Sequence, residues 1–71
     1  MKLIRKIELN CIDDIKNHAK TWIGELYDDG TVITRWGRLN ADLQSKMFPN
    51  AGIDFLNKKE GEKLKKGYEP V

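Results

Sequence analysis

The sequence predicts an α+β domain in which a small antiparallel sheet of about four to five strands carries one C-terminal helix on one face. Three observations point to this class. Short segments with period-two alternation occupy the first 48 residues, an Asp-Gly turn separates two of them, and a segment of helical character follows. At 71 residues the chain forms one domain, residues 1–71, close to the lower size limit for a fold with its own core.

The strand pattern is clearest at the N-terminus and around the turn. Leu3, Ile7 and Leu9 fall on one side of the first segment, which is the alternation of a half-buried strand. Residues 10–18 lack a sustained period and predict a long connection. Asp28-Asp29-Gly30 is a strong turn signal, because Asp-Gly supplies the positive φ of a tight hairpin. The expected strands are 2–9, 20–27, 31–39 and 43–48, with the second and third paired as an antiparallel hairpin.

A helix is expected from about residue 51 to residue 66. Asn50 is suited to cap its first turn, and lysines gather in its last turns, as the helix dipole favours. Gly67 is suited to end it. Pro70 removes a ladder donor, so residues 68–71 suit an edge strand.

Composition favours a binding module over an enzyme. A chain with 39% hydrophobic residues can fold, but it cannot also enclose a large catalytic cleft. No carboxylate pair, metal cluster, phosphate loop or nucleophile–base arrangement stands out, so no cofactor and no metal are expected. Cys11 reads as a reduced small hydrophobe, and His18 lacks partners for metal binding or base catalysis. No apolar run is long enough for a signal peptide or a membrane span, which predicts a cytoplasmic protein without a membrane partner.

Alternation along residues 31–39 divides the side chains between two faces. Ile33 and Leu39 are apolar anchors and are expected to face the core, which would project Trp36 and Arg38 together from the uncovered face of the sheet. Gly37 between them would let another chain approach. Tryptophan is highly buried on average, however, and Val32 shares the face of Trp36, so the sequence leaves burial of Trp36 open. Trp22 is expected in the core.

Four ordered blocks resemble the WGR domain family. The resemblance covers roughly residues 1–71, with departures at residues 10–14 and in the loop before Gln44, where the family usually has two glycines and this chain has Asn40 and Leu43. The last block is typical of bacterial members. The blocks are Asn17-His18-Ala19-Lys20-Thr21-Trp22, Thr34-Arg35-Trp36-Gly37-Arg38-Leu39, Gln44 with Phe48, and the helix that ends in Glu62-Lys63-Leu64-Lys65-Lys66-Gly67-Tyr68.

The resemblance implies a non-enzymatic nucleic-acid-binding module that contacts DNA ends, including ends with a 5′-phosphate, or the DNA backbone. WGR domains occur in poly(ADP-ribose) polymerases activated by DNA damage, but the catalytic domain of those enzymes is absent here. The candidate binding residues are Trp36, Arg38, Lys20, Asn17 and Tyr68.

Each candidate also has a structural interpretation. Lys20 reads equally as a solvated strand residue, Asn17 as a turn residue, and Tyr68 as a ring packed on the helix end. Arg38 reads equally as one partner of a surface ion pair with Asp42 or Glu25.

The charge distribution leaves a second function open. The net charge is only +2, and its excess lies in the C-terminal half, where a lysine-rich helix is most simply a solvated face. Because a dedicated DNA-binding domain is usually more basic, a protein–protein adaptor that uses the open sheet face or a sheet edge is the alternative.

Overall fold

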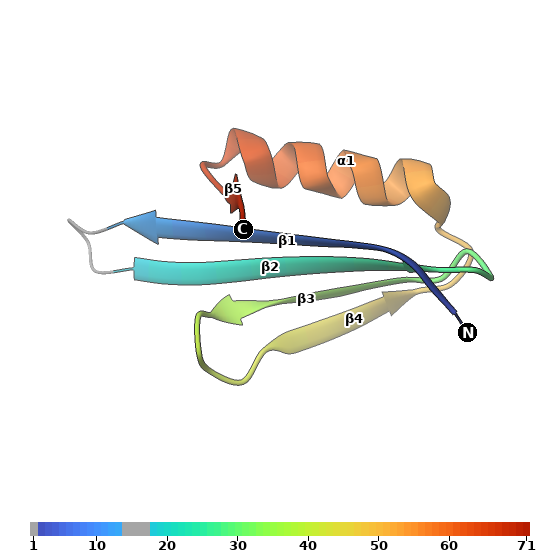
Figure 1. Cartoon of the computed structure of the whole chain (residues 1–71), viewed down its shortest axis with the longest axis horizontal. Coiled ribbons are helices and arrows are strands. Elements are labelled where there is room, and N and C mark those ends of the chain that lie inside the picture. The colour runs from blue at the N-terminus through green and yellow to red at the C-terminus, as the bar shows by residue number, and fades with distance from the viewer. Residues whose placement is uncertain (1, 14–17) are drawn as a thin grey trace.

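The computed structural model describes residues 2–13 and 18–71, which form one sheet with one helix beside it (Figure 1). The sheet order is β4-β3-β2-β1-β5, and each pair of neighbouring strands is antiparallel. This confirms the predicted α+β class with five strands. The elements are β1 Leu3–Asp13, β2 His18–Tyr27, β3 Val32–Arg38, β4 Gln44–Phe48, α1 Gly52–Lys65 and β5 Glu69–Pro70.

The first strand is longer than its alternation predicts. It runs on to Asp13, and its last residues pair with the start of β2 at Cys11↔Lys20 and Ile12↔Ala19. The expected connection over residues 10–18 is therefore wrong for residues 10–13 and His18. Pairing with β2 supplies the backbone partners, and this tertiary contact overrides the weak local propensity.

The predicted hairpin is confirmed between β2 and β3. Gly30 adopts φ 88°, as the turn requires, and the Tyr27 amide donates to the Thr31 carbonyl at 2.9 Å. The Asp29 carboxylate accepts a hydrogen bond from the Thr31 amide at 3.0 Å. This turn also receives the helix, because the Gly52 amide donates to the Gly30 carbonyl at 2.9 Å.

The core lies between the sheet and one face of α1. Trp22 is 2% exposed, as expected, and Leu56 of the helix is fully buried. Gly24 makes this close approach possible, because a Cβ there would lie 2.6 Å from Leu56 Cδ1 and 2.7 Å from Trp22 Cη2. The buried apolar residues are Ile7, Leu9, Trp22, Leu26, Val32 and Leu56.

The two helix ends match the sequence differently. Gly67 adopts φ 97° and its amide donates to the Leu64 carbonyl, while the Tyr68 amide donates to that of Lys63, which confirms the glycine end. The expected Asn50 cap is wrong. Asn50 has φ 56°, Ala51 occupies the cap position, and no side chain caps the first turn. The anchor at this end is the backbone bond to Gly30.

Beyond α1, the tail forms the expected edge strand. In β5, Pro70 pairs with Leu9 and Glu69 with Asn10, at the outer edge of β1. The pairing fixes the chain immediately after the helix and holds the C-terminal turn of α1 over the sheet (Figure 1).

Candidate nucleic-acid interface

The two faces of β3 are the reverse of the expected assignment. Val32 is fully buried and Thr34 is 5% exposed, so these residues and Trp36 face the helix side of the sheet. Trp36 is partly buried against the core. Its expected projection from the uncovered face is therefore wrong. The core takes up Val32 and not Ile33, and Trp36 shares the face of Val32.

On the opposite face, an ion pair replaces the core that the sequence predicted. The carboxylate of Glu25 contacts the guanidinium of Arg35 there. Glu25 is thus paired with Arg35 and not with Arg38, which excludes one of the expected surface ion pairs. Gly37 does not provide an approach for a ligand, because a Cβ at this residue would lie 3.2 Å from Leu43 Cδ2.

The helix covers the helix side of the sheet unevenly and leaves a groove beside β3 and β4. α1 packs more on β2 than on β3. The resulting space, about 280 Å³, is called the basic groove here. It is lined by Trp22, Thr34, Trp36, Lys46, Phe48, Lys59, Glu62, Lys63 and Lys66.

Aromatic rings hold three lysines of the basic groove. The Nζ of Lys46 lies 5.2 Å from the centroid of Phe48, that of Lys59 lies 5.5 Å from Phe55, and that of Lys63 lies 5.6 Å from Tyr68. Among the described residues, Lys59 is the one of these three with an ion pair, to Glu62 at 3.7 Å. Ring contacts position an ammonium group without neutralising it, so these charges stay available to an anion.

The surroundings of Lys63 disfavour its charged form. Partial burial, then the nearby Lys66 and Lys59, lower the pKa of Lys63 below its ordinary value. Both causes disfavour the ammonium form. The Glu62 carboxylate partly offsets them, and a bound anion would add a further charge that favours the ammonium form.

The strand register places two further cations, one on β2 and one on β3, next to the groove. Lys20 of β2 lies directly opposite Arg38 of β3, and Trp22 lies opposite Trp36 two residues further along. Side chains two residues apart on a strand share a face, so Lys20 and Arg38 extend the helix side beyond Trp36. Both cations are exposed, and neither has an ion pair within residues 2–13 and 18–71. Like charges at opposed positions destabilise a sheet.

The predicted site residues thus divide into a placed group and one residue that is not described. Trp36, Arg38 and Lys20 come together on the helix side of β2 and β3. Tyr68 follows the helix end, where its ring contacts Lys63 and its partial burial raises the pKa of its hydroxyl. Asn17 lies outside the described residues.

The lysines that line the groove are not among the candidate binding residues that the sequence predicts. Lys59, Lys63 and Lys66 repeat at spacings of four and three, which places them on one side of a helix. This spacing of the three lysines can be recognised in the sequence alone. Their position beside Trp36 cannot, because that depends on how α1 lies across the sheet.

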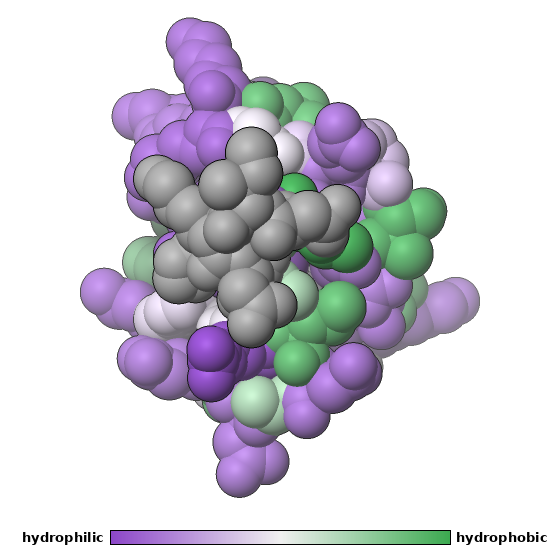
Figure 2. Space-filling view, turned by 90° about the vertical axis from the view of Figure 1, so that its left-hand side faces the viewer, coloured by the Kyte–Doolittle hydropathy of each residue, from purple (hydrophilic) through white to green (hydrophobic). Residues whose placement is uncertain are grey.

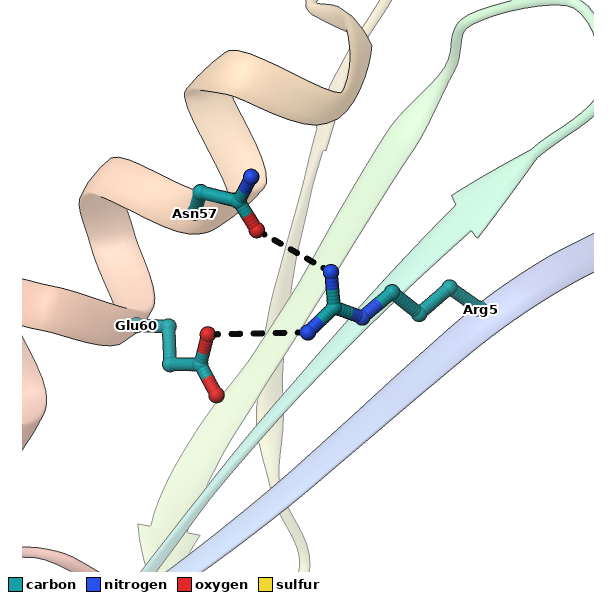
Figure 3. Close-up of polar contacts among 3 residues, drawn as sticks. All are labelled: Arg5, Asn57 and Glu60. Atoms are coloured by element: carbon teal, nitrogen blue, oxygen red, sulfur yellow. Dashed lines mark hydrogen bonds and ion pairs between the residues drawn. The ribbon is translucent and has the colours of Figure 1, made fainter.

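The other flank of the helix is closed. Arg5 of β1 donates to Asn57 Oδ1 at 3.1 Å and lies 3.8 Å from Glu60 Oε1, so one guanidinium joins the strand to two successive turns of α1 (Figure 3). The end of the molecule near the β1–β2 connection is mainly hydrophilic around its rim, with separate apolar patches (Figure 2).

Two further features are absent from the described residues. No group of three or more His, Cys, Asp or Glu side chains there is placed to hold a metal ion. In the same part of the chain, no helix has the length and apolar character needed to cross a membrane.

A comparison with family models identifies the family of the chain. The model of the WGR domain matches residues 5–71, which is nearly the whole chain. The chain belongs to the WGR domain family. Searches of curated proteins and of solved structures returned no match. The WGR match includes every described residue of the basic groove, together with Lys20 and Arg38.

Proposed function

We propose that this WGR domain is a non-enzymatic module that binds the sugar-phosphate backbone of DNA, at or near strand ends, through the basic groove. The observation that supports this most directly is the opposed pair of Lys20 and Arg38 beside Trp36. Two unpaired cations at facing positions cost folding free energy in the free protein. A phosphate between them would turn that cost into two charge-assisted hydrogen bonds.

Trp36 and the helix lysines extend this anion site. The half-buried ring offers a flat apolar surface on which a sugar or base can stack. Lys63 and Lys66 then lie on the opposite wall, where they can meet neighbouring phosphates. Within the described residues the one helix, α1, packs on the sheet, so contacts to the DNA backbone would dominate and binding would be salt-dependent.

Titration of a 5′-phosphorylated duplex and its unphosphorylated counterpart, at two salt concentrations, tests the proposal. Arg38→Gln and Lys20→Gln should each weaken binding and lower the slope of log K against log salt by about 0.9. Lys6→Gln is the matched control, because Lys6 is exposed on β1 and lies opposite Glu25 on the other face of the sheet. Equal effects of all three variants, or no binding at low salt, would refute the proposal.

The open face favours a protein-binding role as the second candidate. Ile12 is 62% exposed and Met47 is 55% exposed, and both lie on the side of the sheet that α1 leaves uncovered. Under this candidate, another protein covers the open face and contacts both side chains, which lie on separate strands. Ile12→Ser with Met47→Ser should abolish partner binding under this candidate and leave DNA binding unchanged.

A further inference from the structure

One side chain of the basic groove has the wrong sign for an anion site. Glu62 of α1 is the sole acid among the described lining residues, alongside four lysines. Its carboxylate lies 3.7 Å from Lys59 Nζ, and its side chain is 45% exposed. The lining therefore has four positive charges and one negative charge, and Lys59 is already engaged.

Stability does not account for this carboxylate. An exposed pair at spacing i, i+3 on a helix stabilises it only weakly. Glu60, two residues earlier, has a clear structural contact with Arg5 on the other flank of the helix. Glu62 instead faces the space that a ligand would occupy.

A carboxylate in this position acts differently on different anions. A nucleic-acid strand spaces its phosphates along the backbone, so one phosphate can lie near Lys63 and Lys66 while a neutral sugar or base lies near Glu62. A compact polyphosphate brings all its charges together and must place one of them close to the carboxylate. Like charges about 4 Å apart repel by about 1 kcal/mol even in water-like surroundings, and a compact polyphosphate adds this repulsion for each charge that it places near Glu62.

We propose that Glu62 is a specificity-determining residue of the basic groove. It forms an ion pair with Lys59 and excludes compact polyphosphates, including the triphosphate group of nucleotides. The inference rests on the proposed function, since it concerns which anion the same groove accepts. It assigns Lys59 to Glu62 in the free protein and leaves Lys46, Lys63 and Lys66 to the strand.

The test compares Glu62→Gln with Glu60→Gln. Both variants remove one negative charge from α1 and keep the side-chain shape, but only the first lies in the groove. Inorganic tripolyphosphate and a short oligothymidine with a 5′-phosphate are titrated into each protein, followed by amide chemical shifts of α1 and β3. Glu62→Gln should bind tripolyphosphate about tenfold more tightly than wild type, and the oligonucleotide only about twofold more tightly. Glu60→Gln should change both affinities by less than about twofold.

Four results would overturn the inference. They are equal gains for both ligands, equal gains in both variants, weaker binding by Glu62→Gln, and no tripolyphosphate binding by any of the proteins. Equal gains would reduce the effect to net charge, and weaker binding would make Glu62 a ligand acceptor. Failure of wild type to bind the oligonucleotide at low salt counts against the proposed function alone, because the tripolyphosphate comparison still decides the role of Glu62.

Discussion

The charged side chains on the two flanks of α1 act in opposite ways. On the β1 side, the guanidinium of Arg5 meets Asn57 and Glu60, and the contact joins strand to helix (Figure 3). On the β3–β4 side, lysines line a groove with Trp36 in it, and most of them have no carboxylate partner among the described residues. A charge with a partner ties elements together, whereas charges of one sign held apart from their counter-ions leave a surface that attracts anions.

Aromatic contacts explain how the open flank tolerates its charge. Lys46, Lys59 and Lys63 each lie over a ring, which stabilises the ammonium group in place. Such contacts typically contribute about 0.5–1 kcal/mol at exposed sites, comparable to a surface ion pair. The lysines are thus ordered before a ligand arrives, and ordering them costs less when it binds.

The largest effect is expected from a substitution that pushes α1 away from the sheet. Both flanks depend on the position of this helix, so the difference between them would be lost. Gly24→Ala places a Cβ 2.6 Å from Leu56 Cδ1, and both side chains it meets are buried, so neither can yield freely. We expect a loss of about 2 kcal/mol in the free energy of unfolding, measured by urea denaturation. Gly61→Ala is the control. It meets nothing within 4 Å in the middle of α1, and should stabilise by about 0.5–1 kcal/mol. The same sign for both variants would contradict this account of how the helix is seated.

A sharper test removes one positive charge from each flank in turn. Lys63→Gln should weaken DNA binding, with a salt slope smaller by about 0.7–0.9. It should leave stability nearly unchanged, because burial disfavours the Lys63 charge while the ring of Tyr68 favours it. Arg5→Gln should do the reverse, with a stability loss of about 0.2–1 kcal/mol and unaltered binding. Fluorescence titration and thermal unfolding of both variants measure the exchange. Loss of binding in Arg5→Gln would show that the closed flank also contacts the ligand.

The sequence predicted the fold well because its strongest signals were local. The Asp28-Asp29-Gly30 turn, the alternation of residues 2–9 and the glycine end of the helix are each set by a few neighbouring residues. The extension of β1 to Asp13 depends instead on pairing with β2. The helix start depends on a backbone bond between Gly52 and Gly30, which no short window of sequence contains.

The structure brings three of the candidate residues together, but on the face of the sheet opposite to the expected one. Trp36, Arg38 and Lys20 were identified by family resemblance, while alternation assigned Trp36 and Arg38 to the uncovered face. The assignment of β3 failed because Ile33 and Val32 are equally apolar, and only the seating of α1 decides which one the core takes. The position of the helix lysines in the basic groove also depends on how α1 lies on the sheet, since a repeat along a helix does not indicate which strand it faces.

A smaller effect is expected at the opposed cations, where stability and binding should move in opposite directions. Arg38→Gln removes a like charge facing Lys20 and should raise the free energy of unfolding by about 0.2–1 kcal/mol while DNA binding weakens. Lys6→Gln serves as the matched control, since this cation lies opposite Glu25. Denaturation at low and high salt checks the cause. The gain should shrink at high salt because screening already relieves the repulsion, and a gain that does not depend on salt would exclude it.

The smallest effect is expected at the turn that anchors the helix start, because it reaches both flanks only through that anchor. Hydrogen bonds from the Thr31 amide and side chain lower the pKa of the exposed Asp29 carboxylate. The ordinary value near 4 applies in the unfolded chain, so this stabilisation is complete above about pH 4 and is lost as the pH falls through the lowered pKa. Asp29→Asn keeps an acceptor for the Thr31 amide but cannot titrate. Thermal unfolding from about pH 7 to about pH 2 should therefore show the wild type slightly more stable at neutral pH, with the difference closing in acid. A difference that stays constant across this range would place the stabilisation in the geometry of the turn and not in the charge of Asp29.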